Sequence, residues 1–170
     1  MKVTGNVWKF AQDDINTDLI RHMKYASLPA KEQAVHCLEG LDPEFGKKAQ
    51  PGDIIVGGLN FGCGSSRPAH TAILALGIGA VLAESYARIF FRSSISGGLL
   101  VVPCPGITAF VNTGDRIEVD TVSGEVKNLT TGGVLSVPPL PPFLREMVEV
   151  GGEKPYLKRR VALAATTAGF

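Results

Sequence analysis

A glycine-rich loop carries the residues of this sequence whose types and spacing are best suited to chemistry. Residues 60–67 read Asn-Phe-Gly-Cys-Gly-Ser-Ser-Arg and combine two glycines, two hydroxyls and a guanidinium. Glycines let the backbone approach a ligand closely, and an arginine can bind a carboxylate through two parallel hydrogen bonds. The loop is therefore predicted to hold a carboxylate or a phosphate. A purely structural strand-to-helix turn is the alternative.

Two motifs with known chemistry do not fit this loop. A phosphate-binding P-loop needs a lysine after its last glycine, and the nucleophile elbow of hydrolases needs the pattern Gly-x-Ser-x-Gly. Neither pattern occurs in the loop. A Ser-His-Asp hydrolase would also need a histidine base, and the sequence does not connect His22, His36 or His70 with Ser65. We interpret His70 as a surface or packing residue.

The composition predicts one domain without a broad charged surface. A chain of 170 residues that is 45% hydrophobic is long enough to bury a core. Its 17 basic and 16 acidic side chains give a formal net charge of +1, which offers no extended field for nucleic acid or an anionic membrane. A small anionic ligand must therefore be held by local contacts.

The start of the chain and its cysteines favour a cytoplasmic protein with free thiols. Residues 1–5 lack the apolar core of a signal peptide, and no segment approaches the roughly 20 apolar residues that span a bilayer. Cys37, Cys63 and Cys104 are odd in number and widely spaced. This spacing matches neither a disulfide framework nor a Cys-x-x-Cys metal site, so we expect no metal ligands here.

The elements that must position the loop form a predicted β-α-β-α-β run. Buried strands are predicted at residues 53–56, 80–83 and 99–102, with short helices between them at residues 68–76 and 87–94. Pro68 suits the first turn of a helix, and Gly77 suits its end. Strands joined by helices are expected to be parallel. The glycine-rich loop would then link the first strand to the first helix.

Other patterns flank this central run. They predict a strand at residues 3–10, a loop or short helix at 11–30, a helix-containing connector at 29–46, a β-hairpin at 115–129 and an amphipathic helix at 143–150. Several prolines form a stiff bridge before the last of these helices. Together the elements predict one α/β domain.

Four motifs, in order, resemble the swivelling domain of the aconitase superfamily. They are residues 14–18, the glycine-rich loop, residues 85–93 continued by 98–100, and the late hairpin at 114–132. The likeness covers nearly all of residues 3–160. Because the chain is short, it is similar to the separate small subunits of isopropylmalate dehydratase and homoaconitase-like enzymes rather than to full-length aconitase.

The resemblance implies a fold, a reaction and a partner. The fold would be a swivelling β/β/α domain over residues 1–160, with a mixed, partly parallel sheet flanked by helices, and residues 161–170 would be a C-terminal tail. The reaction would be that of a hydro-lyase, 3-isopropylmalate dehydratase of leucine biosynthesis, which isomerises a malate-type acid by dehydration and rehydration. A large subunit would hold a [4Fe-4S] cluster, so this chain would bind no cofactor and act only with that partner.

The resemblance also assigns roles in and near the loop. Ser65 would remove the proton beside a substrate carboxylate as an alkoxide, because a neutral hydroxyl is a poor base. Arg67 would bind a carboxylate of the substrate, Ser66 would orient it or hydrogen-bond to it, and Gly64 would also contact the substrate. Asp18 would lie at the edge of the active site and orient a partner group. An N-cap or turn aspartate is the alternative interpretation of Asp18.

The segment after Asp18 would contact the variable end of the substrate. Arg21 or Lys24 could meet a distal carboxylate, while Met23 and Tyr25 could line an alkyl pocket. Each of these side chains could equally be solvated. This segment does not clearly match the isopropylmalate or the homoaconitate pattern of the family, so both polar and branched substrates remain open.

A second departure follows Arg67. The family usually continues with a glutamate, whereas residues 68–70 are Pro-Ala-His here. The two departures leave two alternative functions open. One is the small subunit of an enzyme that acts on another acid, such as 2,3-dimethylmalate dehydratase or homoaconitase. The other is a non-catalytic anion-binding or regulatory module. The expected partners are a large iron–sulfur subunit and a small di- or tricarboxylate, without nucleic acid or membrane. Self-association of the isolated chain is left open.

Overall fold

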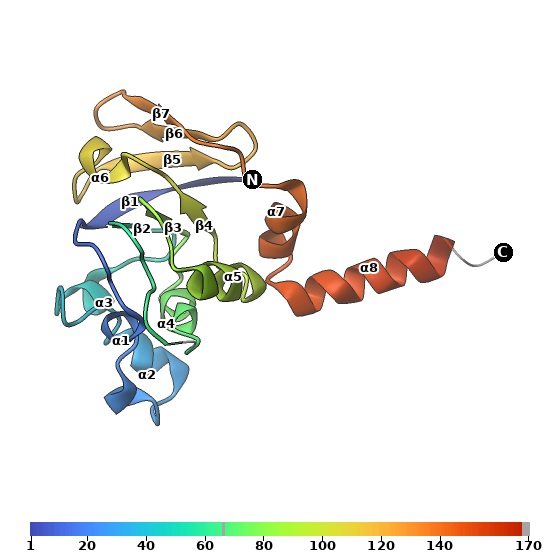
Figure 1. The fold of residues 1–170 in the computed structure, drawn as a ribbon, viewed down its shortest axis with the longest axis horizontal. Coiled ribbons are helices and arrows are strands. Elements are labelled where there is room, and N and C mark those ends of the chain that lie inside the picture. The colour runs from blue at the N-terminus through green and yellow to red at the C-terminus, as the bar shows by residue number, and fades with distance from the viewer. Residues whose placement is uncertain (66, 168–170) are drawn as a thin grey trace.

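A curled sheet of seven strands forms the centre of the chain in the computed structural model, which describes residues 1–65 and 67–167 (Figure 1). The strands are β1 (Lys2–Phe10), β2 (Ile54–Gly57), β3 (Ala80–Ala83), β4 (Val101–Pro103), β5 (Arg116–Asp120), β6 (Glu125–Asn128) and β7 (Val134–Ser136). Their order in the sheet is β4-β3-β2-β1-β5-β6-β7. The first strand of the sequence therefore lies in the middle of the sheet.

Strand β1 joins a parallel half of the sheet to an antiparallel half. Its first residues pair with β5 in antiparallel register, as Gly5 does with Ile117. Its last residues pair with β2 in parallel register, as Val7 does with Ile54. Strands β3 and β4 extend the parallel half, and β6 and β7 extend the antiparallel half. The predicted mixed sheet, the parallel run and the hairpin are all confirmed.

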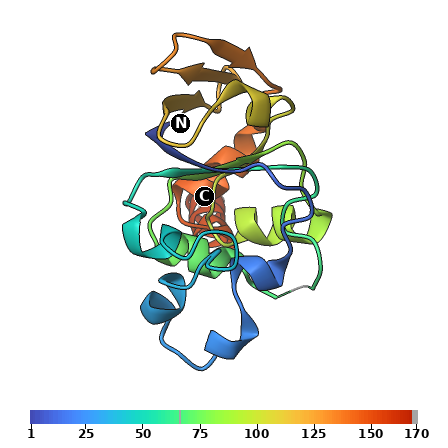
Figure 2. The ribbon, with the colours of Figure 1, turned by 90° about the vertical axis from the view of Figure 1, so that its left-hand side faces the viewer.

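Helices cover one side of the parallel half, and the antiparallel strands lie over the other (Figures 1 and 2). The helices in the described part of the chain, on either side of the sheet, are α1 (Thr17–Ile20), the 3₁₀ helix η1 (Met23–Tyr25), α2 (Ala30–Ala34), α3 (Phe45–Lys48), α4 (His70–Ala75), α5 (Arg88–Ser96), α6 (Ile107–Phe110), α7 (Pro142–Glu149) and α8 (Glu153–Thr167). Helices α1 to α5 lie on the side opposite β5–β7, while α8 extends away from the body of the chain (Figure 1).

Two hydrophobic clusters explain why the central strands are apolar along their whole length. Strands β2 and β3 are buried at every residue. Successive side chains of a strand point to opposite faces. Ile55 and Val81 pack with the helices, whereas Ile54 and Leu82 pack with the antiparallel strands. Because both faces are covered, apolar residues are needed at consecutive positions.

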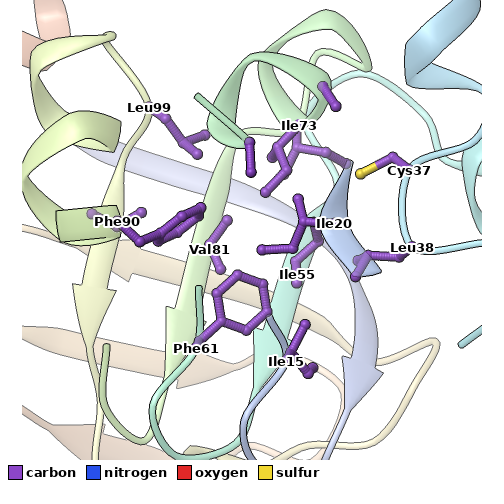
Figure 3. Packing of buried hydrophobic residues seen from close by; sticks show 14 of the residues in the cluster. Ile15, Ile20, Cys37, Leu38, Ile55, Phe61, Ile73, Val81, Phe90 and Leu99 are labelled. Atoms are coloured by element: carbon purple, nitrogen blue, oxygen red, sulfur yellow. The ribbon is translucent and has the colours of Figure 1, made fainter. Parts of the chain in front are cut away.

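Phe61 fixes the glycine-rich loop to the cluster on the helix side (Figure 3). Its side chain is fully buried, and its ring centroid lies 5.5 Å from that of Phe90 in an edge-on arrangement. The next residue, Gly62, has a φ of 80°, and a Cβ at this position would overlap the Phe90 side chain. Glycine alone satisfies both the backbone angle and the close packing at position 62.

The helix after the glycine-rich loop begins later than the sequence predicts. Helix α4 begins at His70, because a turn comes first in which the amide of Ala69 donates to the carbonyl of Arg67 at 2.7 Å. Pro68 therefore precedes the helix instead of forming its first turn. Helix α4 has only 6 residues, so the loop does not lie at the mouth of a long helix dipole. Gly77 follows the helix with a φ of 75°, as predicted for a stop.

Three elements have no counterpart among the sequence predictions. They are α6, β7 and α8. Helix α8 crosses the predicted boundary between residues 160 and 161, and its apolar residues do not gather on one face. The division into residues 1–160 and 161–170 stays a prediction. Within the described part of the chain, every helix is too short or too polar to span a bilayer.

Replacement of Gly62 by alanine is expected to destabilise the protein more than the same change at Gly132. Both glycines have nearly the same φ, 80° and 81°, but no atom lies within 4 Å of the Cβ position of Gly132. The backbone penalty shared by the two variants is about 1–2 kcal/mol. Overlap with Phe90 adds roughly 1–3 kcal/mol in Gly62→Ala. Urea denaturation measures both values, and equal losses would contradict the packing described above.

Candidate functional site

The glycine-rich loop lies at the carboxyl ends of β1, β2 and β3. It follows β2 directly, and its backbone is bonded to the segments that follow the other two strands. The amide of Gly62 donates to the carbonyl of Ile15 at 2.7 Å, and the amide of Phe61 donates to the carbonyl of Ser85 at 3.0 Å. Ligands of α/β proteins commonly bind at this edge of the sheet. The fold thus gathers the loop and residues 13–18 into one candidate site.

Arg67 connects the two halves of this site. Its Nη1 donates to Asp18 Oδ1 at 2.5 Å and its Nη2 donates to Asp18 Oδ2 at 3.2 Å, which is a bidentate pair. Its Nε donates to Ser65 Oγ at 2.7 Å. The side chains of Arg67 and Asp18 are 33% and 50% exposed, so a ligand can reach the pair. The structure therefore brings together three residues that the sequence predicted as functional.

Thr17 completes this cluster and was not predicted as a functional residue. Its hydroxyl lies 3.3 Å from Ser65 Oγ and accepts a hydrogen bond from the Ser65 amide at 3.3 Å. Asn16 caps helix α1, because its side-chain oxygen accepts from two amides of the first turn at 3.0 and 2.9 Å. The alternative interpretation of Asp18 as the N-cap is therefore wrong. The sequence gives one indication of a role for Thr17, because Thr17 directly precedes Asp18, a predicted site residue.

Gly64 and Ser66 are the other two loop residues that were predicted to contact a ligand. Gly64 has a φ of 95°, and a Cβ there would lie 3.4 Å from Thr17 Oγ1. Its left-handed backbone lets the chain turn back toward Thr17 just before Ser65. Ser66 lies outside the described residues. Its predicted role in substrate binding stays a prediction.

Arg21 and Lys24, the predicted contacts for a distal carboxylate, are both bound by other side chains. Arg21 Nε donates to Gln33 Oε1 at 2.5 Å, and Gln33 Nε2 donates to a backbone carbonyl at 2.5 Å. Lys24 Nζ lies 2.9 Å from Glu39 Oε1. These contacts attach residues 21–28, here called the anchored loop, to the segment that follows it. Sequence reasoning missed both Gln33 and Glu39.

Glu39 accepts hydrogen bonds from three side chains. The Tyr25 hydroxyl donates at 2.6 Å, Lys24 Nζ lies at 2.9 Å, and His36 Nδ1 lies 2.7 Å from the second carboxylate oxygen. The Tyr25 ring also stacks on His36 with centroids 3.6 Å apart. Burial raises the pKa of Glu39, but the hydrogen bonds outweigh burial and lower the pKa to about 2. The carboxylate is therefore charged at neutral pH.

The chain resembles known proteins over nearly its whole length. Residues 3–105 match the sequence profile of the Aconitase C-terminal domain. The chain belongs to this family. The resemblance that four motifs indicated is thereby confirmed.

Relatives of this member of the aconitase C-terminal domain family are themselves small subunits. The isopropylmalate/citramalate isomerase small subunit of Methanocaldococcus jannaschii is 49% identical over 94% of this chain and 96% of that protein. The 3-isopropylmalate dehydratase small subunit of Thermodesulfovibrio yellowstonii is 46% identical over 96% of this chain and 98% of that protein. A crystal structure of 3-isopropylmalate dehydratase from M. jannaschii has a TM-score of 0.90 and 36% identity, covering 99% of this chain and 100% of that one. The α/β fold is thus shared.

In the described part of this aconitase-family chain, no histidine is hydrogen-bonded to Ser65. His36 is held by Glu39, and His22 Nδ1 accepts from a backbone amide at 3.1 Å. His70 is buried, as expected for a packing residue, and its Nδ1 has no hydrogen-bond partner among the described residues. Burial lowers the pKa of His70, and the charge of Arg21 lowers it further. A Ser-His-Asp arrangement is therefore not formed.

The cysteines are poor candidates for metal ligands. Burial raises the pKa of all three thiols, that of Cys104 to about 12 and those of Cys37 and Cys63 as well. A thiol must be deprotonated to ligate a metal or an iron–sulfur cluster. Among the described residues, no group of three or more His, Cys, Asp or Glu is placed to hold a metal ion. The part of the chain that the structure describes thus offers no group of side chains that fits an iron–sulfur cluster.

The low pKa of Glu39 predicts an acid-dependent loss of stability. The ordinary pKa of 4.5 applies to the unfolded chain and a pKa of about 2 to the folded one. The Glu39 contacts therefore stabilise the fold fully above pH 4.5, and this contribution disappears as the pH falls toward 2. Between these values the stability of Glu39→Gln should depend less on pH than that of the unmodified chain.

Urea denaturation at several pH values measures this difference. Glu32→Gln is a matched control, because the Glu32 side chain is exposed and has no hydrogen bond or ion pair within the described part of the chain. Its stability should follow the pH dependence of the unmodified chain. The same pH dependence in Glu39→Gln would contradict the role given to Glu39.

Proposed function

We propose that this chain is the small subunit of a 3-isopropylmalate dehydratase, a hydro-lyase of leucine biosynthesis. The observation that carries the proposal is the cluster in which the Arg67 guanidinium binds Asp18 and donates to Ser65 Oγ at 2.7 Å. Such a cluster can bind a carboxylate and hold a proton acceptor beside it. Relatives that are 43–49% identical and bear the name 3-isopropylmalate dehydratase small subunit support the same reaction.

Arg67 would bind a carboxylate of the substrate. Its two terminal nitrogens donate to the carboxylate of Asp18, which has the charge and shape of a substrate carboxylate. Asp18 would thus keep the guanidinium extended and oriented until the substrate arrives. Because the pair is partly exposed, replacement of Asp18 by the substrate needs little rearrangement of the fold. Gly64 and Ser66 would line the same subsite.

Ser65 would accept the proton from the carbon next to that carboxylate. A neutral serine hydroxyl is a weak base, so the oxygen must carry negative charge when it acts. Arg67 Nε, at 2.7 Å from Ser65 Oγ, would stabilise this alkoxide by a charge-assisted hydrogen bond. The Thr17 hydroxyl at 3.3 Å can add a second donor. In the rehydration step Ser65 would return a proton to the neighbouring carbon.

A large subunit would supply the rest of the active site. We propose that it carries the [4Fe-4S] cluster through its own cysteines, because the cysteines of this chain do not fit that role. When bound, the cluster acts as a Lewis acid toward the substrate hydroxyl. Arg21 and Lys24 would meet a distal substrate carboxylate through further donors, while they keep their contacts with Gln33 and Glu39.

Reconstitution tests the proposed function directly. The chain, combined with an iron–sulfur large subunit, should convert isopropylmalate, whereas the chain alone should be inactive. Citramalate is a second candidate substrate, because the relative from M. jannaschii is named for both acids. Assays of the reconstituted pair with each acid distinguish the two. Failure to assemble with a large subunit would instead favour an anion-binding or regulatory module.

Replacement of Ser65 by alanine is expected to remove turnover without preventing assembly. Loss of a general base lowers kcat by roughly 10²–10⁴-fold. Steady-state assays of the reconstituted enzyme measure kcat, and size-exclusion chromatography measures assembly. Ser136→Ala, at an exposed position of strand β7, is the control and should keep full activity. Near-normal turnover in Ser65→Ala would rule out the proposed role.

Replacement of Arg67 by lysine is expected to raise KM and also to lower kcat, because the bidentate grip on the carboxylate and the Nε bond to Ser65 are both lost. An ammonium keeps the positive charge but loses the bidentate geometry of the guanidinium. The lost charge-assisted hydrogen bond predicts a rise in KM of roughly tenfold or more. Initial rates over a range of isopropylmalate concentrations give both constants. An unchanged KM would show that Arg67 does not bind the substrate.

A further inference from the structure

We propose that Glu39 is a positioning residue that holds the anchored loop, residues 21–28, which follows directly on the helix that contains Asp18, the partner of Arg67. Its carboxylate contacts two residues of this loop. It accepts a hydrogen bond from the Tyr25 hydroxyl at 2.6 Å and lies 2.9 Å from the Lys24 ammonium. Both contacts fall on the same carboxylate oxygen, while the other oxygen lies 2.7 Å from His36 Nδ1. One carboxylate thus joins two loop residues to the segment that follows the loop.

The backbone next to Glu39 is packed into the core. The Glu39 side chain can therefore hold the loop in place. The preceding residue, Leu38, is fully buried, and its amide donates to the carbonyl of Ile20 at 3.4 Å. Figure 3 shows Leu38 and Ile20 in the same cluster, where both side chains pack beside the sheet. A side chain that extends from a packed backbone can act as a rigid acceptor for a more exposed loop.

The anchored loop is joined to the site through a single short helix. Helix α1 contains Asp18, the partner of Arg67, and ends at Ile20, directly before Arg21. Asp18 lies within one helical turn of Arg21. A displacement of residues 21–28 would therefore also shift the Asp18 carboxylate, which orients Arg67. This continuity is the reason why a contact made by Glu39 should affect substrate binding.

Ring packing and charge strengthen the same attachment. The Tyr25 ring stacks on the His36 ring at an interplanar angle of 9°, and Lys24 Nζ lies 4.6 Å from the centre of the Tyr25 ring. The Glu39 side chain is 25% exposed, so its ionic contacts are partly shielded from solvent. Charge-assisted hydrogen bonds to a partly shielded carboxylate are stronger than exposed neutral ones.

The first test uses hydrogen exchange on the isolated chain and needs no enzyme activity. Glu39→Gln should speed the exchange of amides in residues 22–28 several-fold, while amides in strands β2 and β3 keep their rates. Glu32→Gln, a change of the same kind on α2, should leave the loop as slow as in the unmodified chain. Tyr25→Phe removes one donor but keeps the ring stack, and should give a smaller increase. Unchanged loop exchange in Glu39→Gln would overturn the proposal.

The second test rests on the proposed function and uses the reconstituted enzyme. Glu39→Gln should raise KM by roughly 2- to 10-fold, the effect of one net hydrogen bond, with kcat within about twofold of the unmodified enzyme. A general loss of folding would lower kcat through the fraction of active enzyme and leave KM unchanged. Such a result, or an unchanged KM despite faster loop exchange, would overturn the positioning role. An unmodified enzyme without activity would count against the proposed function, and hydrogen exchange would still decide whether Glu39 holds the loop.

Discussion

The pair formed by Arg67 and Asp18 is the interaction on which the site depends. It ties the segment after β1 to the loop after β2, across 49 positions of the sequence. Through its Nε, Arg67 also fixes Ser65, so one guanidinium orients a carboxylate and a hydroxyl together. A planar group with several fixed donors is suited to this arrangement, and a lysine could not reproduce it. Arg67 thus holds the carboxylate of Asp18 and the hydroxyl of Ser65 in fixed positions relative to each other.

The mixed sheet makes this pair possible. Strand β1 is parallel to β2 along its second half, so both strands end at the same edge and deliver their following loops side by side. Its first half pairs with β5, which brings the antiparallel strands over the opposite face. The central strands are therefore enclosed by two clusters, and their loops start from a rigid base. Phe61 extends one of these clusters into the glycine-rich loop itself.

The ion pairs and hydrogen bonds of the basic side chains determine how the site can bind an anion. Arg67 is paired with Asp18 and Lys24 with Glu39, while the Nε of Arg21 is bonded to Gln33. A chain with a formal net charge of +1 attracts anions only weakly at long range. A substrate carboxylate must therefore match the geometry of Asp18 to replace it at Arg67. Such competition favours selection by shape over selection by charge alone.

The sequence by itself determined the parallel strands, the hairpin, the glycine-rich loop and the types of residue in the site. Each of these follows from patterns within one or two elements, where burial and turn geometry dictate the residue types. The tertiary structure alone decided that Thr17 lies beside Ser65 and that Glu39 holds the anchored loop. It also moved the start of α4 to His70. Contacts between residues distant in sequence depend on strand order, which no local pattern encodes.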